Sequence, residues 1–154
     1  MTGIELLEAW MQQAGLDDSA KDDSGRVCAF TFNDIFPVTL EAPAYCDDLF
    51  IIIEMTSIGT SEIRRKRLET AMKLNAYALE TRGAALGWDT IGERIVLSHR
   101  ATAENTTAEM LDNMVANLLD VAEQLLPELE MKKEAEAQQK LDAGFDKMFQ
   151  PVTP

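Results

Sequence analysis

The fold is decided by residues 68–100, LETAMKLNAYALETRGAALGWDTIGERIVLSHR, because a helical pattern ends within them and two strand patterns follow. In the first half, mostly apolar residues recur at intervals of three or four, which places them on one face of a helix. Gly83 suits the left-handed conformation that closes a helix, so we expect the helix to run to this residue. The shared face comprises Leu68, Met72, Asn75 and Leu79.

The second half of this stretch has the pattern of a β-hairpin. Leu86 and Trp88 alternate with small residues, residues 89–92 have turn chemistry, and residues 94–99 alternate around Ile95 and Leu97. A helix that leads directly into an antiparallel pair is typical of an α+β protein. No residue of the stretch has an obvious catalytic role.

Three more strands are expected before this stretch, at residues 26–32, 36–42 and 48–56, where apolar side chains alternate with other residues. The connections between them are too short for a crossover helix, so the three strands form a meander. A helix at residues 4–14, ended by Gly15, precedes them.

The longest helical pattern covers residues 103–129 and has an apolar face broad enough to pack on a sheet. Pro127 is expected to kink this helix or to end it a residue earlier. We expect one domain at residues 1–129, and an acidic helical extension and tail at residues 130–154. The tail contains a last apolar cluster, formed by Leu141, Phe145, Met148 and Phe149.

The predicted fold class is therefore α+β. We expect a single-layer antiparallel sheet of about five strands with three main helices, in the order α-β-β-β-α-β-β-α. At 154 residues, the chain is long enough to bury a core without disulfides or metals. A sheet layer of this size leaves its strand edges and one helix face uncovered. A second copy of the chain commonly covers such surfaces, which predicts a homodimer.

The chain is strongly acidic, with a formal net charge of -13 and a pI of about 4.4. This charge opposes binding to nucleic acid or to an anionic membrane surface. Cys28 and Cys46 have neither a disulfide framework nor a metal-binding spacing, which favours reduced thiols. The N-terminus is acidic where a signal peptide is basic, and the apolar run at residues 49–53 is too short to span a bilayer. We expect a cytoplasmic protein with no membrane insertion and no nucleic-acid partner.

Catalysis finds little support in the sequence. His99 is the only histidine, and neither cysteine lies in an activating context. The eight glycines do not cluster into a phosphate-binding loop, and the paired acids lie in turn-like stretches. We expect no enzyme activity, no cofactor and no metal. An enzyme that uses His99 or a thiol is the alternative.

Residues 64–67, Arg-Arg-Lys-Arg, concentrate positive charge in the first turns of the central helix, where cations oppose the helix dipole. Two interpretations stay open. The run is either a solvated face that moderates self-repulsion, or a docking site for an acidic partner segment or a second subunit.

The order of these elements and several local patterns resemble the class I type III secretion chaperones, the Tir-chaperone family, over roughly residues 4–129. The basic run and the residues after Leu129 depart from the family pattern. The resemblance rests on IELL at residues 4–7, GRVCAF at 25–30, Ala71 and Met72 with Asn75, GAALGWD at 83–89 and IVLS at 95–98.

This resemblance implies a cytoplasmic bacterial homodimer that binds the N-terminal region of one or more secreted effectors and keeps them soluble, without a nucleotide. A regulatory module that sequesters a protein controlling secretion is the alternative. The resemblance places the dimer contact at Leu68, Met72, Asn75, Leu79, Leu86 and Trp88. It places the client groove at Leu6, Leu7, Trp10, Met11, Phe30, Phe32, Val38 and Leu40.

Overall fold

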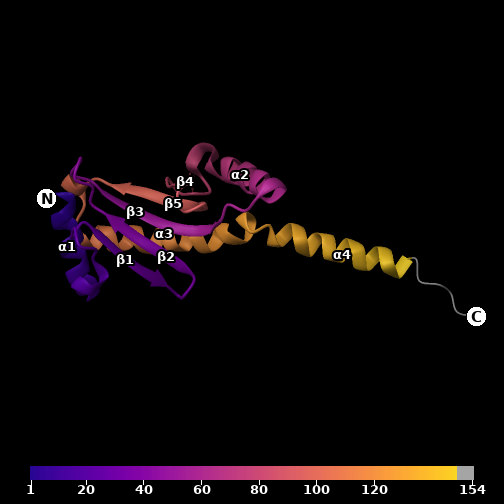
Figure 1. Cartoon of the computed structure of the whole chain (residues 1–154), viewed down its shortest axis with the longest axis horizontal. Coiled ribbons are helices and arrows are strands. Elements are labelled where there is room, and N and C mark those ends of the chain that lie inside the picture. The colour runs from indigo at the N-terminus through magenta and orange to yellow at the C-terminus, as the bar shows by residue number, and fades with distance from the viewer. Residues whose placement is uncertain (149–154) are drawn as a thin grey trace, which may run out of the picture.

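The computed structural model describes residues 1–148, without the side chains of residues 132–138, and it confirms the α+β fold (Figure 1). Its five strands are β1 (Val27–Phe32), β2 (Phe36–Glu41), β3 (Leu49–Ser57), β4 (Ala85–Asp89) and β5 (Arg94–Ala101). The α-helices of the described chain are α1 (Gly3–Ala14), α2 (Ser61–Asn75), α3 (Ala108–Leu129) and α4 (Lys132–Met148). Short 3-10 helices cover Asp18–Ala20, Ala76–Ala78 and Ala103–Asn105.

The strands form one antiparallel sheet in the order β1-β2-β3-β5-β4. The predicted meander of the first three strands is confirmed. β4 lies at an edge, because β5 returns between β3 and β4. Leu97 on β5 therefore pairs with Ile53 on one side and with Leu86 on the other, and all three side chains are buried.

The core lies between one face of the sheet and helices α1 and α3, with α3 running behind the sheet in Figure 1. Alternate side chains of β2 and β3 enter this core, as the period of two along a strand requires. The largest fully buried side chains are Leu6, Leu7, Val38, Leu40, Leu49, Ile51, Ile53, Ile58, Ile95, Leu97, Leu111 and Leu129.

Helix α1 has defined ends that fix where it sits on the sheet. Thr2 and Glu5 form a capping box, and the hydrogen bonds from Thr2 hold the pKa of Glu5 below its usual value. Gly15, with φ 71°, closes the helix as predicted. A Cβ on Gly3 would lie 2.5 Å from the carbonyl oxygen of Asp48, so glycine lets the helix start directly against the turn before β3.

The prediction that the central helix runs to Gly83 is wrong, because α2 ends at Asn75. Tyr77 and Ala78 take left-handed conformations with φ of 59° and 53°, which breaks the helical path. The cause is Asn75, whose side chain accepts from the backbone nitrogen of Leu86 at 2.8 Å and donates to its carbonyl at 2.9 Å. This pair of bonds ties β4 to the end of α2, so the chain must turn in between.

The earlier helix end expected at Pro127 is wrong, because α3 continues through it to Leu129. The alternative, a kink at Pro127, stays a prediction. Proline removes a single backbone donor and here lies in the last turn, where few further bonds depend on it. Leu129 is fully buried, and its carbonyl accepts from Arg67 at 3.2 Å. Packing and this bond hold the last turn in place.

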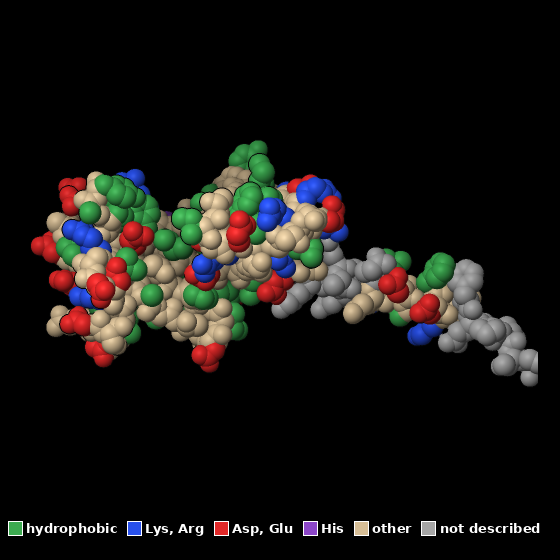
Figure 2. Space-filling model, viewed as in Figure 1, with side chains coloured by type: hydrophobic (Ala, Val, Ile, Leu, Met, Phe, Trp, Pro, Cys, Tyr) green, Lys and Arg blue, Asp and Glu red, His purple; other side chains and the backbone are tan. Residues whose placement is uncertain are grey.

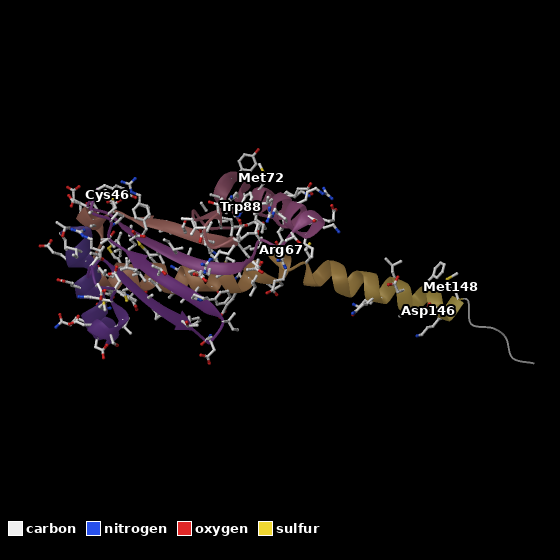
Figure 3. All side chains as sticks on the ribbon, viewed as in Figure 1. Cys46, Arg67, Met72, Trp88, Asp146 and Met148 are labelled. Carbon is white, nitrogen blue, oxygen red and sulfur yellow. The ribbon has the colours of Figure 1, made fainter. Side chains whose placement is uncertain are left out.

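Most of the basic run at residues 64–67 is used within the chain. Arg67 donates to the carbonyls of Ser57 and Leu129, which fastens α2 to the ends of β3 and α3 (Figure 3). Arg65 pairs with Glu62 and Glu69 on the surface of α2. Arg64 donates to the carbonyl of Gly59 at 3.2 Å and lies 3.6 Å from the carboxylate of Glu93. Three of the four residues therefore form bonds within the chain, which neither interpretation of the run includes.

Helix α4 projects away from the sheet, beyond the end of α3 (Figure 1). It contains three residues of the predicted apolar cluster, Leu141, Phe145 and Met148, and all three are exposed. Phe149 lies outside the described residues. The domain boundary predicted after Leu129 stays a prediction.

The Asn75 tie to β4 can be tested with Asn75→Asp, which keeps the shape of the side chain but removes its N–H donor. The carboxylate would face the carbonyl of Leu86, and we expect a loss of about 1–3 kcal/mol in the free energy of unfolding, measured in urea. The control, Asn113→Asp on the exposed side of α3, should change it by less than about 0.5 kcal/mol. Equal stability of the two variants would contradict the assigned role.

Candidate protein-binding surfaces

An apolar groove lies on the helix-covered side of the sheet, between α1, α3 and the edge strand β1. It has a cavity volume of about 440 Å³. The groove exists because α3 packs against β3 and β5, while Phe30 and Phe32 on β1 are only half-buried. It is lined by Trp10, Ala14, Leu16, Phe30, Phe32, Asp112, Val115, Ala116, Leu119, Asp120 and Glu123.

Trp10 lines this groove and is held by contacts with α3 and β1. Its indole N–H donates to Asp112 on α3 at 3.1 Å, and its ring lies 5.9 Å from that of Phe30. A tilted aromatic pair of this spacing adds stability beyond the buried area. The groove is therefore largely preformed.

The charge of the groove comes from α3. Asp112, Asp120 and Glu123 line it, although Asp120 also pairs with Arg82 at 2.8 Å. An apolar floor beside carboxylates favours a ligand that presents apolar side chains flanked by basic ones. The arrangement suits a peptide segment better than a small anionic metabolite.

The structure brings together three of the eight residues predicted for the groove: Trp10, Phe30 and Phe32. The other five, Leu6, Leu7, Met11, Val38 and Leu40, are buried in the core and do not line the groove. Leu6, Leu7 and Met11 lie one helical turn from lining residues of α1, whereas Val38 and Leu40 lie on the neighbouring strand β2. The sequence pattern alone does not say which apolar positions a second helix covers.

Sequence reasoning missed the α3 side of the groove, which includes Val115, Ala116 and Leu119. The sequence does contain a signal for this side. The apolar face of residues 103–129 is wider than packing on a sheet requires, so part of it remains to line a groove.

A second surface lies at the edge of the sheet opposite β1, where α2 packs against β4. It is here called the α2–β4 patch. Figure 2 shows hydrophobic side chains gathered over this region, and Figure 3 labels Met72 on α2 and Trp88 on β4. Met72 is 76% exposed, Tyr77 93% and Leu79 74%, which is unusual for large apolar residues. The exposed members of the patch are Ile63, Met72, Tyr77, Leu79, Trp88 and Ile91.

The six residues predicted for the dimer contact divide between this patch and the interior. Met72, Leu79 and Trp88 are exposed, and the guanidinium of Arg64 lies 5.3 Å from the centre of the Trp88 ring. In contrast, Leu86 is buried, Leu68 is half-buried against the core, and Asn75 bonds to Leu86. These three support the patch from within the chain.

The described residues place no reactive group in either surface. His99 lines a separate hollow of about 120 Å³, next to Asn117 and Thr81. Burial raises the pKa of the Cys28 thiol, which is the opposite of an activated nucleophile. Within residues 1–148, apart from the side chains left undescribed, no cluster of three or more His, Cys, Asp or Glu residues could hold a metal ion. No helix in this part of the chain is long and apolar enough to cross a membrane.

A preformed apolar groove and an exposed apolar patch on a small α+β scaffold define a protein-binding module. A model of the Tir chaperone protein (CesT) family matches residues 5–126, so this chain belongs to that family and is a type III secretion chaperone by class. Helix α4 lies beyond the matched residues.

Solved structures share this fold. One is the ExsC-ExsE complex, with a TM-score of 0.61 and 23% identity over 82% of this chain and 92% of that chain. Another is the HopA1-SchA chaperone-effector complex, with a TM-score of 0.60 and 18% identity over 79% and 91%. A third is the ExoU-SpcU complex from the type III secretion system of Pseudomonas aeruginosa. Its TM-score is 0.58, and it is 16% identical over 77% of this chain and 93% of that chain. The search of curated proteins returned no match.

The groove can be tested with an uncharged hydrophobic dye, 6-propionyl-2-(dimethylamino)naphthalene, in a Trp88→Phe background that leaves Trp10 as the single tryptophan. We expect the dye to quench Trp10 fluorescence, and Ala116→Gln to weaken the dye's affinity several-fold, because the longer polar side chain fills the groove. Asn113→Gln, one turn away but outside the lining, is the matched control. If the two variants bind the dye equally, the groove assignment is wrong.

Proposed function

We propose that this chain is a cytoplasmic, non-catalytic homodimer that holds the N-terminal segment of a secreted effector in the groove lined by Trp10, Phe30 and Ala116. The observation that carries the proposal is the groove itself, preformed, apolar and bordered by carboxylates. The family supplies the class of client, and the groove supplies the place to bind it.

The client's binding mode follows from the chemistry of the groove. A segment that is disordered before binding can insert apolar side chains between Trp10 and Phe32, and can place basic residues near Asp112 and Glu123. Its ordering on binding costs free energy, so apolar anchors are needed to offset it. Client binding in this groove requires no nucleotide, because the binding step itself is the function.

The α2–β4 patch is the proposed dimer interface. Isologous contacts would bury Met72, Leu79 and Trp88 against the same residues of a second copy and would cover the free edge of β4. The dimer would then carry two grooves related by its two-fold axis.

The interface is tested with Met72→Glu combined with Leu79→Glu. Each substitution would bury an unpaired carboxylate, so we expect dimerisation to weaken by more than about tenfold. Light scattering should give a mass near twice 17.1 kDa for the unchanged chain and near 17.1 kDa for the variant at the same concentration. Met110→Glu, at an exposed methionine on α3, should stay dimeric. A double variant that stays dimeric would move the interface elsewhere.

The client site is tested by co-expressing the tagged chain with candidate secreted proteins. We expect it to retain an effector through the N-terminal segment, and Ala116→Gln to retain several-fold less while remaining dimeric. Asn113→Gln should retain the unchanged amount. Recovery of a globular regulator as the sole partner would instead favour the sequestering module.

A further inference from the structure

A small hollow lies between α3, β5 and the turn that leads into β4, and it has a cavity volume of about 120 Å³. It exists because β5 extends past the start of β4, where Ala85 pairs with Ser98. His99, one residue further along β5, lies beyond this pairing and on the same face of the strand as the buried Leu97 and Ala101. The turn before β4 covers this corner of the sheet only in part.

The hollow contains a buried hydroxyl that lacks a partner. Thr81 is 0% exposed, and its Oγ1 makes no hydrogen bond within the described chain. The carbonyl of Thr81 accepts from the backbone nitrogen of Ala84 at 3.1 Å, so the turn is closed without the hydroxyl. Native structures seldom leave a buried hydroxyl unpaired, because its lost bonds to water are then not replaced. Since Thr81 lines the hollow, a ligand held there can supply the missing bond.

The other polar groups of the hollow favour an anion over a cation. Arg82 donates to Asp120 at 2.8 Å, which offsets part of its charge, but the guanidinium has further N–H groups to offer. His99 and Asn117 each add a nitrogen donor. Among the described residues that line the hollow, none is acidic, although the whole chain has a formal net charge of -13. Arg82 and Asn117 are exposed, so an anion can enter from solvent.

The rest of the lining is apolar and consists of Ala84, Met114, Leu118 and Val121. A phosphate ion presents oxygens on every side, and some of them would lie against these side chains, which offer no donor. A carboxylate on a short aliphatic stem instead divides into a polar and an apolar half, as the lining does. The volume of the hollow is roughly four times that of a liquid water molecule, which suits an acid of three carbons.

We propose that the hollow binds a carboxylate on a short aliphatic stem. The carboxylate oxygens accept from Thr81, His99 and Asn117, and the stem packs against Leu118 and Val121. A free short-chain acid and the side chain of a glutamate have this chemistry in common. The site goes beyond the proposed function and does not depend on it, because the residues of α3 that line the hollow and the groove lie on opposite flanks of the helix.

The test is a titration of the full chain with propionate, which corresponds to a glutamate side chain without its backbone. His99 is the only histidine, so its imidazole gives a single set of signals in the NMR spectrum. At constant pH and sodium concentration, we expect these signals to shift saturably, with the millimolar affinity that so small a ligand allows. Propionamide, which has the same shape but no charge, should bind at least about tenfold more weakly. A shift that does not saturate, or equal affinity for the two ligands, would overturn the proposal.

Two variants test the groups assigned to the site. Thr81→Val keeps the shape but removes the hydroxyl, so it should weaken propionate binding several-fold without lowering the free energy of unfolding in urea, because the hydroxyl has no bond to lose. Thr90→Val, in the exposed turn after β4, is its control. Asn117→Asp should weaken binding several-fold through repulsion between carboxylates, whereas Asn113→Asp, one turn earlier on α3, should not. Unchanged binding in either test variant, or a loss of stability in Thr81→Val, would contradict the assignment.

A second ligand, glutamate with its amino group acetylated and its α-carboxyl amidated, distinguishes the two sources of the carboxylate. If it binds at least as tightly as propionate, the opening admits a side chain carried by a protein, and the ligand is a glutamate of a partner chain. If propionate binds and the blocked glutamate does not, the ligand is a free short-chain acid. Both results support the carboxylate site. Ala116→Gln, which fills the groove, should leave the affinity for propionate unchanged, and a weaker affinity would show that propionate binds in the groove and would overturn the proposal.

Discussion

The sheet is wider than the helices that cover it, and the surfaces of this protein depend on that mismatch. Five strands span roughly 19–24 Å, whereas one packed helix covers about 10 Å. α3 covers the strands at the middle of the sheet and α1 covers one end, which leaves Phe30 and Phe32 at the β1 edge half-buried. The apolar groove follows directly from this incomplete layer, and so does its need for a partner.

The opposite edge is organised by a polar residue. Asn75 satisfies both backbone groups of Leu86, and in doing so it ends α2 and fixes β4 beside β5. In the turn after Asn75, the side chains of Tyr77 and Leu79 are exposed to solvent. The bonds that Asn75 makes inside the chain therefore help to form the exposed α2–β4 patch. One amide therefore supports the proposed dimer surface without belonging to it.

The strands, α1 and the fold class could be predicted because alternation, spacing and turn residues act locally. The end of α2 could not, because the bonds between Asn75 and Leu86 join residues eleven positions apart and override a helical pattern that is otherwise intact. Only part of the groove could be predicted, for a similar reason. Periodicity identifies Leu6, Trp10 and Val38 as apolar face residues, but only the packing of α3 decides that Trp10 lines the groove while the other two lie in the core.

The two tryptophans give the most direct test of the central claim, because Trp10 lies in the groove and Trp88 in the α2–β4 patch. Each contributes one indole N–H signal to the NMR spectrum of the nitrogen-15-labelled protein. On titration with the N-terminal segment of an effector, the account predicts that the Trp10 signal shifts, since its N–H bonds to Asp112 at the groove wall, while the Trp88 signal stays in place. A shift of the Trp88 signal alone, or of neither signal with a segment that binds, would contradict it.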